Sequence, residues 1–310
     1  MVIREIIKDG SKLPVITEPG IYSGIDNSRY HGQCTDTPSI SSSMLKTLAD
    51  ECPAVLRHNS YLNSERVYEP KSHFEFGTAL HLMYLEPHLL ADAIEVLDFP
   101  DWRTKKAQEA RDAARAEGKT PLLPDDVAKL HAMRSALLDD PIARTAFTGG
   151  HSELSHFIKD RETGVWLKCR TDYLRELKES AAVISDYKSS TTANPDDFCR
   201  KAWGYRYFQS AAFYIDIVRQ TTGLDVSDFW MVTQSKSAPY LVTVNRFDAD
   251  ALEAGRELNR KAIRQFAQCL ARDEWPGYRH ADTPDLPTAF TLSLPRYAEH
   301  EIAQILGAAA

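Results

Sequence analysis

The chain has 310 residues, of which 43% are hydrophobic and 26% charged, and its formal net charge is −7. This length suits one large domain or two small ones, and the composition is typical of a globular protein with a sizeable core. The negative balance gives no overall basic signature of nucleic-acid binding, although local basic patches would still permit it.

Cysteine usage and apolar runs narrow the class further. The five cysteines are scattered without a CxxC pair, so neither a disulfide framework nor a zinc ribbon is indicated. The N-terminus lacks the apolar segment of a signal peptide, and no apolar run approaches the ~20 residues of a membrane span. We therefore expect a cytoplasmic protein that does not enter a membrane.

The N-terminal third begins irregularly and becomes helical. Residues 1–40 are rich in Gly, Pro, Ser, Asp and Asn, which predicts an irregular arm with one or two short strands. Residues 41–49 predict a helix for which serines offer the N-cap, and residues 54–61 a second short helix after Pro53.

Residues 73–87 predict a core-facing helix, because apolar residues recur at helical spacing: Phe76, Ala79, Leu80, Met83 and Tyr84. His81 lies on this helix, four residues after Gly77. A lone histidine beside an apolar face is either a hydrogen-bonded core residue or a metal ligand. Residues 101–147 are charged and predict a helical insertion, whose basic part either touches a phosphate backbone or is a solvated face.

The middle of the chain predicts a β-sheet. Residues 151–158, 164–174 and 183–190 are strand-like, and the polar residues before the third would let the chain turn back. The three would form an antiparallel meander.

Acidic side chains converge in this meander. If the chain folds back about Glu179, Asp172 falls opposite Asp186, and Lys188 shares a face with Asp186 because side chains alternate along a strand. Two carboxylates this close repel unless a cation lies between them or one is protonated, and a hard ion such as Mg²⁺ or Mn²⁺ suits an oxygen-rich site. Glu153 could reach the same site or lie on the surface. An isolated D-x-K triplet is common, and a cross-strand ion pair at an exposed strand end usually explains it.

The C-terminal half supplies further helices and strands. Asn194 and Pro195 predict the cap and first turn of a helix, and residues 207–216 a second core helix. Basic and aromatic residues interleave between them, which suits a DNA-end surface or an aromatic core edge: Arg200, Lys201, Trp203, Tyr205, Arg206 and Tyr207. Two strands over residues 229–234 and 240–244 and an amphipathic helix over residues 248–271 follow.

Strands in the middle of the chain, with helices before, between and after them, indicate an α/β fold with a central mixed sheet flanked by helices. We expect an arm over residues 1–40, one domain over residues 41–275 that contains the insertion, and an irregular tail over residues 276–310.

The ordered set of Gly77-x-x-x-His81, Asp172, Asp186-x-Lys188 and a helix with Gln209 and Tyr214 resembles the RecB-like branch of the PD-(D/E)XK nuclease superfamily. Segments 76–81, 186–188 and 211–214 are similar to the RecE-type exodeoxyribonuclease VIII group of phages and prophages, and the resemblance spans residues 41–243. In that family the Gln and Tyr are usually four apart. Here they are five apart, about 140° around a helix, which leaves open whether Gln209 or Ser210 faces the site.

The resemblance implies a PD-(D/E)XK fold with an antiparallel catalytic hairpin, in which Asp172 and Asp186 hold one or two Mg²⁺ or Mn²⁺ ions. The backbone carbonyl of Tyr187 would be a further ligand, as would His81 and Glu153. Lys188 would orient the attacking water. Some relatives carry an iron–sulfur cluster on one early and three late cysteines; the late cysteines are missing here, so we expect no such cluster.

The same resemblance implies that Tyr214, Gln209 and Arg206 contact DNA. The implied substrate is linear double-stranded DNA, degraded from 5′ to 3′ to leave 3′ single strands. A single-strand annealing protein is the implied partner, and the implied assembly is a trimeric or tetrameric ring. Three alternatives stay open: a nuclease of different polarity or endonucleolytic action, a DNA-end-binding module without catalysis, and a metal hydrolase with a non-nucleic substrate.

Overall fold

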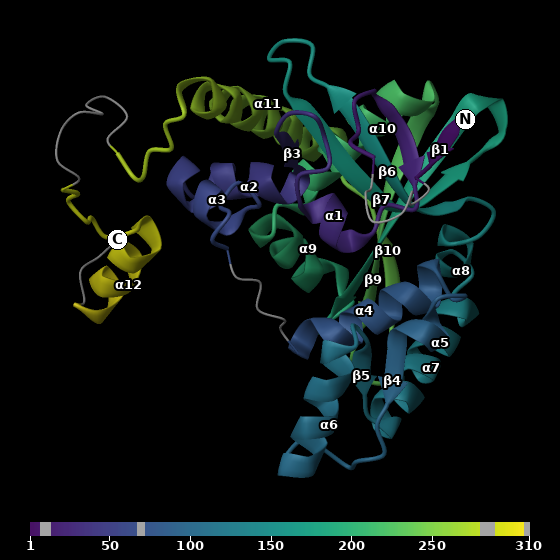
Figure 1. The fold of residues 1–310 in the computed structure, drawn as a ribbon. Coiled ribbons are helices and arrows are strands. Elements are labelled where there is room, and N and C mark those ends of the chain that lie inside the picture. Colours follow the sequence, from purple (N-terminus) through teal and green to yellow (C-terminus); the bar gives the residue numbers. More distant parts are fainter. Residues whose placement is uncertain (7–13, 67–71, 280–288, 307–310) are drawn as a thin grey trace.

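The fold was analysed in a computed structural model that describes residues 1–6, 14–66, 72–279 and 289–306 (Figure 1). Its centre is a mixed sheet in the order β1-β2-β6-β7-β8-β9-β10, with β3 pairing with β7 as an additional strand. The strands are β1 (Ile3–Glu5), β2 (Gly20–Ser23), β3 (Ser39–Ser41), β6 (His151–Lys159), β7 (Trp166–Glu176), β8 (Ala181–Ser190), β9 (Asp225–Ser235) and β10 (Val242–Asn245). The predicted mixed sheet is confirmed.

The antiparallel meander β6-β7-β8 is present as predicted. A 3₁₀ turn, η1 (Lys178–Ser180), reverses the chain between β7 and β8. Tyr173 pairs with Ser185 in this hairpin, so the same register places Asp172 opposite Asp186. β8 then pairs with β9 in parallel along its whole length, which fixes the acidic end of β8 inside the sheet.

Helices cover both faces of the sheet. On one face, α2 (Ser42–Asp50), α10 (Tyr207–Thr222) and α11 (Ala249–Arg272) pack on apolar strand residues such as Ile184 and Met231. On the other, α4 (Ser72–Leu85) and α7 (Pro124–Asp139) pack on Tyr187 and Val232. Alternation along β8 therefore places Ile184 under the first layer and Tyr187 under the second.

Further helices are α1 (Asn27–His31), α3 (Pro53–Asn59), α5 (Leu90–Ala93), α6 (Lys105–Ala116), α8 (Ala143–Ala146) and α9 (Pro195–Gly204). Asn194 caps α9 as predicted, since its side chain accepts a hydrogen bond from the backbone N–H of Asp196. Among the described residues no helix combines the length and apolar character that a membrane span requires.

The insertion contains strands as well as helices. β4 (Ile94–Val96) and β5 (Thr120–Leu122) form a separate two-stranded parallel sheet, grouped with α5–α8 away from α11 in Figure 1. The sequence predicts helices over residues 101–147 with an interruption at Gly118 and Pro121, and β5 occupies that interruption between α6 and α7. Pro121 disfavours a helix there, and Leu122 is buried between the surrounding helices.

The N-terminal arm contains the short strands that the sequence predicts, whereas the C-terminal tail is more regular than predicted. β1 and β2 extend the main sheet, and Ile16, Tyr22 and Tyr30 form a buried cluster with Phe157 and Trp166. Near the C-terminus, α12 (Arg296–Ile305) is helical where an irregular tail was expected. Pro295 is the N-cap of this helix. The prolines around it in the sequence favoured the prediction of an irregular tail instead.

The packing of α11 on α10 generates a prediction about stability. A Cβ at Gly255 would lie 2.8 Å from the carbonyl oxygen of Phe208, whereas a Cβ at Gly77 of α4 would have no atom within 4 Å. Alanine favours a helix by ~1 kcal/mol over glycine. We expect Gly77→Ala to raise the melting temperature and Gly255→Ala to lower it, because overpacking costs ~1–3 kcal/mol. Equal increases in both variants would contradict the close packing of the two helices.

Candidate active site

Three carboxylates lie in one row across adjacent strands. Glu153 of β6, Asp172 of β7 and Asp186 of β8 occupy successive positions in the register of the meander. All three are largely buried, with side-chain exposures of 26%, 15% and 11%. One potential ligand atom from each of His81, Glu153 and Asp172 lies within 4.8 Å of the others. The structure thus brings together the acids that the sequence predicted, and Glu153 belongs to the group rather than to the surface.

A break in strand regularity creates this arrangement. Glu153 has a φ of 51°, and its pairing with β7 is interrupted. Cys169 and Leu174 of β7 both contribute to the core beneath α10 although they are five residues apart. Strict alternation would place them on opposite faces, so β7 changes face near Asp172. The Asp172 carboxylate then lies between the strands, where its Oδ2 accepts a 2.8 Å hydrogen bond from the backbone N–H of Tyr187.

Asp186 and Lys188 project together from β8. Nζ of Lys188 lies 2.5 Å from Oδ2 of Asp186, as an ion pair, and 3.3 Å from the carbonyl oxygen of Tyr187. Burial raises the pKa of Asp186, and Lys188 opposes that effect. Burial also lowers the pKa of Lys188, but the carboxylates of Asp186 and Asp172 outweigh it, so the pKa rises well above its usual value. Lys188 is therefore a permanent cation beside the acids.

His81 reaches the row from α4. Its Nδ1 lies 3.9 Å from Oδ2 of Asp172, and its ring packs edge-on against Tyr187. The phenol of Tyr187 points away from the acids and donates a 2.8 Å hydrogen bond to Oε1 of Gln234, which also accepts one from Tyr84. This buried network fixes the backbone of β8 at the acidic row; it joins residues too far apart in sequence to be predicted.

The predicted DNA-contacting residues separate in the structure. Tyr214 lines a cavity of about 190 Å³ together with Asp186, Lys188 and Ser210. Gln209 is fully buried at the interface with α11, where its backbone carbonyl accepts a hydrogen bond from Asn259. Gln209 therefore does not line this cavity, and its contact with DNA stays a prediction. The five-residue spacing turns Gln209 away from the cleft and Ser210 toward it.

Two other basic residues lie near this cavity. Arg206 forms an ion pair with Asp50 of α2 and lies over the Trp203 ring, and it directly precedes Tyr207, which lines the cavity. Lys46 of α2, which the sequence analysis did not identify, lines the cavity itself. The sequence signal for Lys46 is its position four residues after Ser42, which places both side chains on one face of α2. That face is turned toward the cleft, because Ser42 donates a 2.8 Å hydrogen bond to Ser210.

The donor set fits a hard divalent cation. Carboxylate oxygens with an imidazole and a nearby carbonyl match the preferences of Mg²⁺ and Mn²⁺. The mutual repulsion of the acids supports this fit. Burial, with repulsion from Asp172, raises the pKa of Glu153 to about 8, so without a cation the row resists full ionisation. Glu153, Asp172, Asp186 and His81 are the side chains that would hold the ion.

The raised pKa of Glu153 predicts how pH affects the metal-free protein. Its value is 4.5 in the unfolded chain and about 8 in the fold, so between these pH values the folded state binds the extra proton. Stability is therefore lost as pH rises through this window. Glu153→Gln should flatten the fall in melting temperature that the parent shows in EDTA. Glu162→Gln is the control, because Arg264 lowers the pKa of Glu162 and its removal leaves the fall in place. An equally steep fall in Glu153→Gln would contradict the assignment.

Comparison with known proteins places this chain in a family. Residues 41–284 match the model of a PDDEXK-like domain of unknown function (DUF3799). A search of curated proteins gave no match.

Among solved structures, the crystal structure of a "putative exonuclease" from Eubacterium rectale aligns with a TM-score of 0.59 and 14% identity, covering 91% of this chain and 98% of that one. At this identity the likeness shows the fold alone. The crystal structure of SSO0001 aligns with a TM-score of 0.28 and 12% identity over 62% of this chain and 85% of that one. Because the family model spans most of the chain, the protein belongs to the PDDEXK-like DUF3799 family and has the PD-(D/E)XK nuclease fold.

Proposed function

We propose that the protein is a Mg²⁺- or Mn²⁺-dependent exodeoxyribonuclease that degrades linear double-stranded DNA from 5′ to 3′ and leaves 3′ single strands. The observation that carries this proposal is the row of Glu153, Asp172 and Asp186 with Lys188 at its end. Hydrolysis of a phosphodiester requires stabilisation of negative charge on the phosphate and a positioned water, and this row provides the groups for both.

Each residue has a distinct role in this proposal. Asp172 and Asp186 hold the divalent ion, which supplies Lewis-acid chemistry when bound, and His81, Glu153 and the Tyr187 carbonyl complete its surroundings. Lys188 cannot be a metal ligand, because an ammonium offers only donors. Its charge orients the attacking water and offsets the charge that develops on the phosphate. Tyr214, on the wall of the same cavity, contacts the DNA backbone.

The direction of digestion, the partner and the assembly rest on the resemblance of segments 76–81, 186–188 and 211–214 to RecE-type enzymes. On that basis we further propose a cytoplasmic homo-oligomeric ring that passes its 3′ strands to a single-strand annealing protein.

Digestion of linear and closed circular duplex DNA, with Mg²⁺ or with EDTA, tests the proposal. We expect the linear form to shorten in Mg²⁺ only and the circular form to persist. Asp186→Asn should abolish digestion and weaken metal binding measured by calorimetry, because one ligand charge is lost. End labels at the 5′ or 3′ terminus report the polarity. Binding of linear DNA without any digestion in Mg²⁺ or Mn²⁺ would support a DNA-end-binding module instead.

Lys188 gives the sharpest prediction about catalysis. Lys188→Ala should reduce single-turnover cleavage by at least ~10²-fold while the protein still binds DNA in Ca²⁺, since the loss falls on the transition state. If Lys188 merely paired with Asp186, the same substitution would change stability and leave cleavage close to the parent rate. Loss of cleavage only in proportion to loss of DNA binding would also remove Lys188 from the catalytic set.

A further inference from the structure

Lys46 is a second cation in the cleft, and its ammonium has no acidic partner there. Its Nζ lies 5.4 Å from the centre of the Tyr207 ring, and Nζ of Lys188 lies 5.8 Å from the same centre. Among the described residues Lys188 pairs with Asp186, whereas no carboxylate forms an ion pair with Lys46. Both ammonium groups therefore lie beside the same phenol ring, and Asp186 and Asp50 attract Lys46 without forming an ion pair with it.

This arrangement is unfavourable without a ligand. Burial lowers the pKa of Lys46 and repulsion from Lys188 adds to that effect, while attraction to Asp186 and Asp50 opposes it without outweighing it. A partly buried cation without a partner costs free energy that an entering anion would recover. The cavity that Lys46 lines is continuous with the acidic row through Asp186 and Lys188. An anion bound at Lys46 would thus lie next to the position of the cleaved phosphate.

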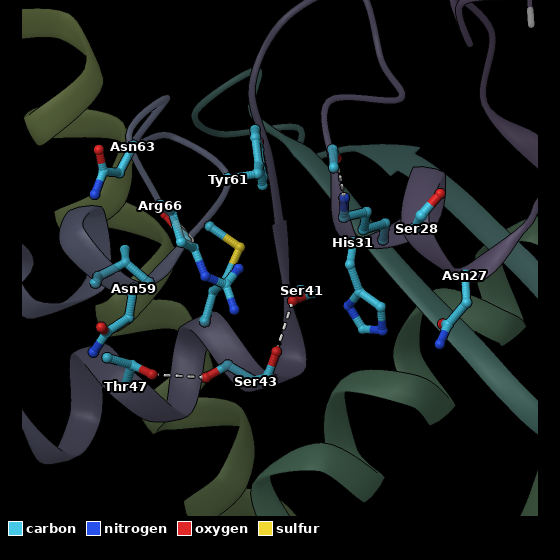
Figure 2. Close-up of a pocket in the computed structure, with 15 residues that line it drawn as sticks. Asn27, Ser28, His31, Ser41, Ser43, Thr47, Asn59, Tyr61, Asn63 and Arg66 are labelled. Carbon is cyan, nitrogen blue, oxygen red and sulfur yellow. Dashed lines mark hydrogen bonds between the residues drawn. The ribbon is translucent and has the colours of Figure 1, made fainter. Parts of the chain in front are cut away.

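A larger cavity of about 820 Å³ adjoins this one and shares His31, Ser41 and Ser43 with it. Figure 2 shows it surrounded by polar side chains from α1, α2, α3 and the segment after α3. The lining of this cavity includes no carboxylate among the described residues, although the chain contains 44 acidic residues. Its neutral and cationic groups include Asn27, Thr47, Asn59, Tyr61, Asn63 and Arg66. Its volume lies within the ~300–1,000 Å³ range of ligand pockets.

We propose that the two cavities form one path for the DNA strand that is cleaved, with Lys46 contacting the phosphate next to the scissile one. The larger cavity receives the unpaired nucleotides beyond it, where amides and hydroxyls meet base edges. This inference rests on the proposed nuclease function and names the strand-holding part of the same site. Lys46 is a positioning residue, because it holds the strand rather than the reacting atoms.

Binding of a short fluorescein-labelled oligothymidylate, measured by anisotropy in Ca²⁺ over a range of salt concentrations, tests the proposal. Lys46→Met should weaken binding ~10-fold, because it removes one charge-assisted contact. The slope of log affinity against log salt should decrease by about 1, as for loss of one phosphate contact. Lys46→Arg should restore most of the affinity and the slope, since it keeps the charge.

Two further variants complete the design. Lys129→Met is the matched control, because Lys129 is also a half-buried lysine over an aromatic ring, that of Phe76, but lies on α7 in the insertion. It should bind as the parent does. Ser43→Phe narrows the junction of the two cavities without a change of charge, so it should weaken binding and leave the salt slope unchanged.

The inference would be overturned if Lys46→Met bound the oligothymidylate with the same affinity and the same salt slope as the parent. So would an equal loss in Lys46→Met and Lys46→Arg with lowered melting temperatures, since that pattern indicates a structural role. Parental binding in Ser43→Phe would remove the larger cavity from the path and overturn the proposal of one continuous path. If the parent digests linear duplex DNA while these variants fail the expectations, only this inference falls; if the parent digests no DNA, the proposed function itself is wrong.

Discussion

The repulsion among Glu153, Asp172 and Asp186 is the constraint on which the rest of the structure depends. Three carboxylates on adjacent strands, each mostly removed from water, destabilise the sheet unless cations and hydrogen-bond donors face them. The chain supplies some of these itself: the Lys188 ammonium, the N–H of Tyr187 and the His81 ring. They offset this cost only in part, since burial, with repulsion from Asp172, raises the pKa of both Glu153 and Asp186. A divalent cation would balance the negative charge of the carboxylates that remains.

The two helical layers hold this energetically unfavourable row of carboxylates in place. Tyr187 extends beneath α4 and α7, where Gln234 and Tyr84 fix its hydroxyl, and Asp186 and Lys188 extend toward α2 and α10. A displacement of β8 by one residue would exchange these faces, so burial of Tyr187 fixes the orientation of the acids. The cleft on the α2 side is consequently cationic and polar, while the α4 side supplies the imidazole.

Local patterns predicted most of this arrangement. A fold-back about Glu179 gave the register that places Asp172 opposite Asp186, because hairpin register follows from strand spacing alone. The five-residue spacing in α10 left open whether Gln209 or Ser210 faces the cleft. In the structure Gln209 packs against α11 and Ser210 lines the cavity. Lys46, the Tyr187–Gln234 bond and β5 could not be predicted in the same way, since each depends on contacts between segments far apart in sequence. The positive φ of Glu153 likewise follows from the irregular pairing of β6 with β7, which no glycine signals.

A crystal structure of the protein with Mn²⁺, with data collected at the manganese absorption edge, tests the central claim most directly. We predict an anomalous peak at the carboxylates of Asp172 and Asp186, with His81 and Glu153 beside it, and no such peak in Asp186→Asn. The account would be contradicted if Mn²⁺ were fully occupied at another position in the crystal, with Asp172 and Asp186 unchanged and Lys188 still paired with Asp186.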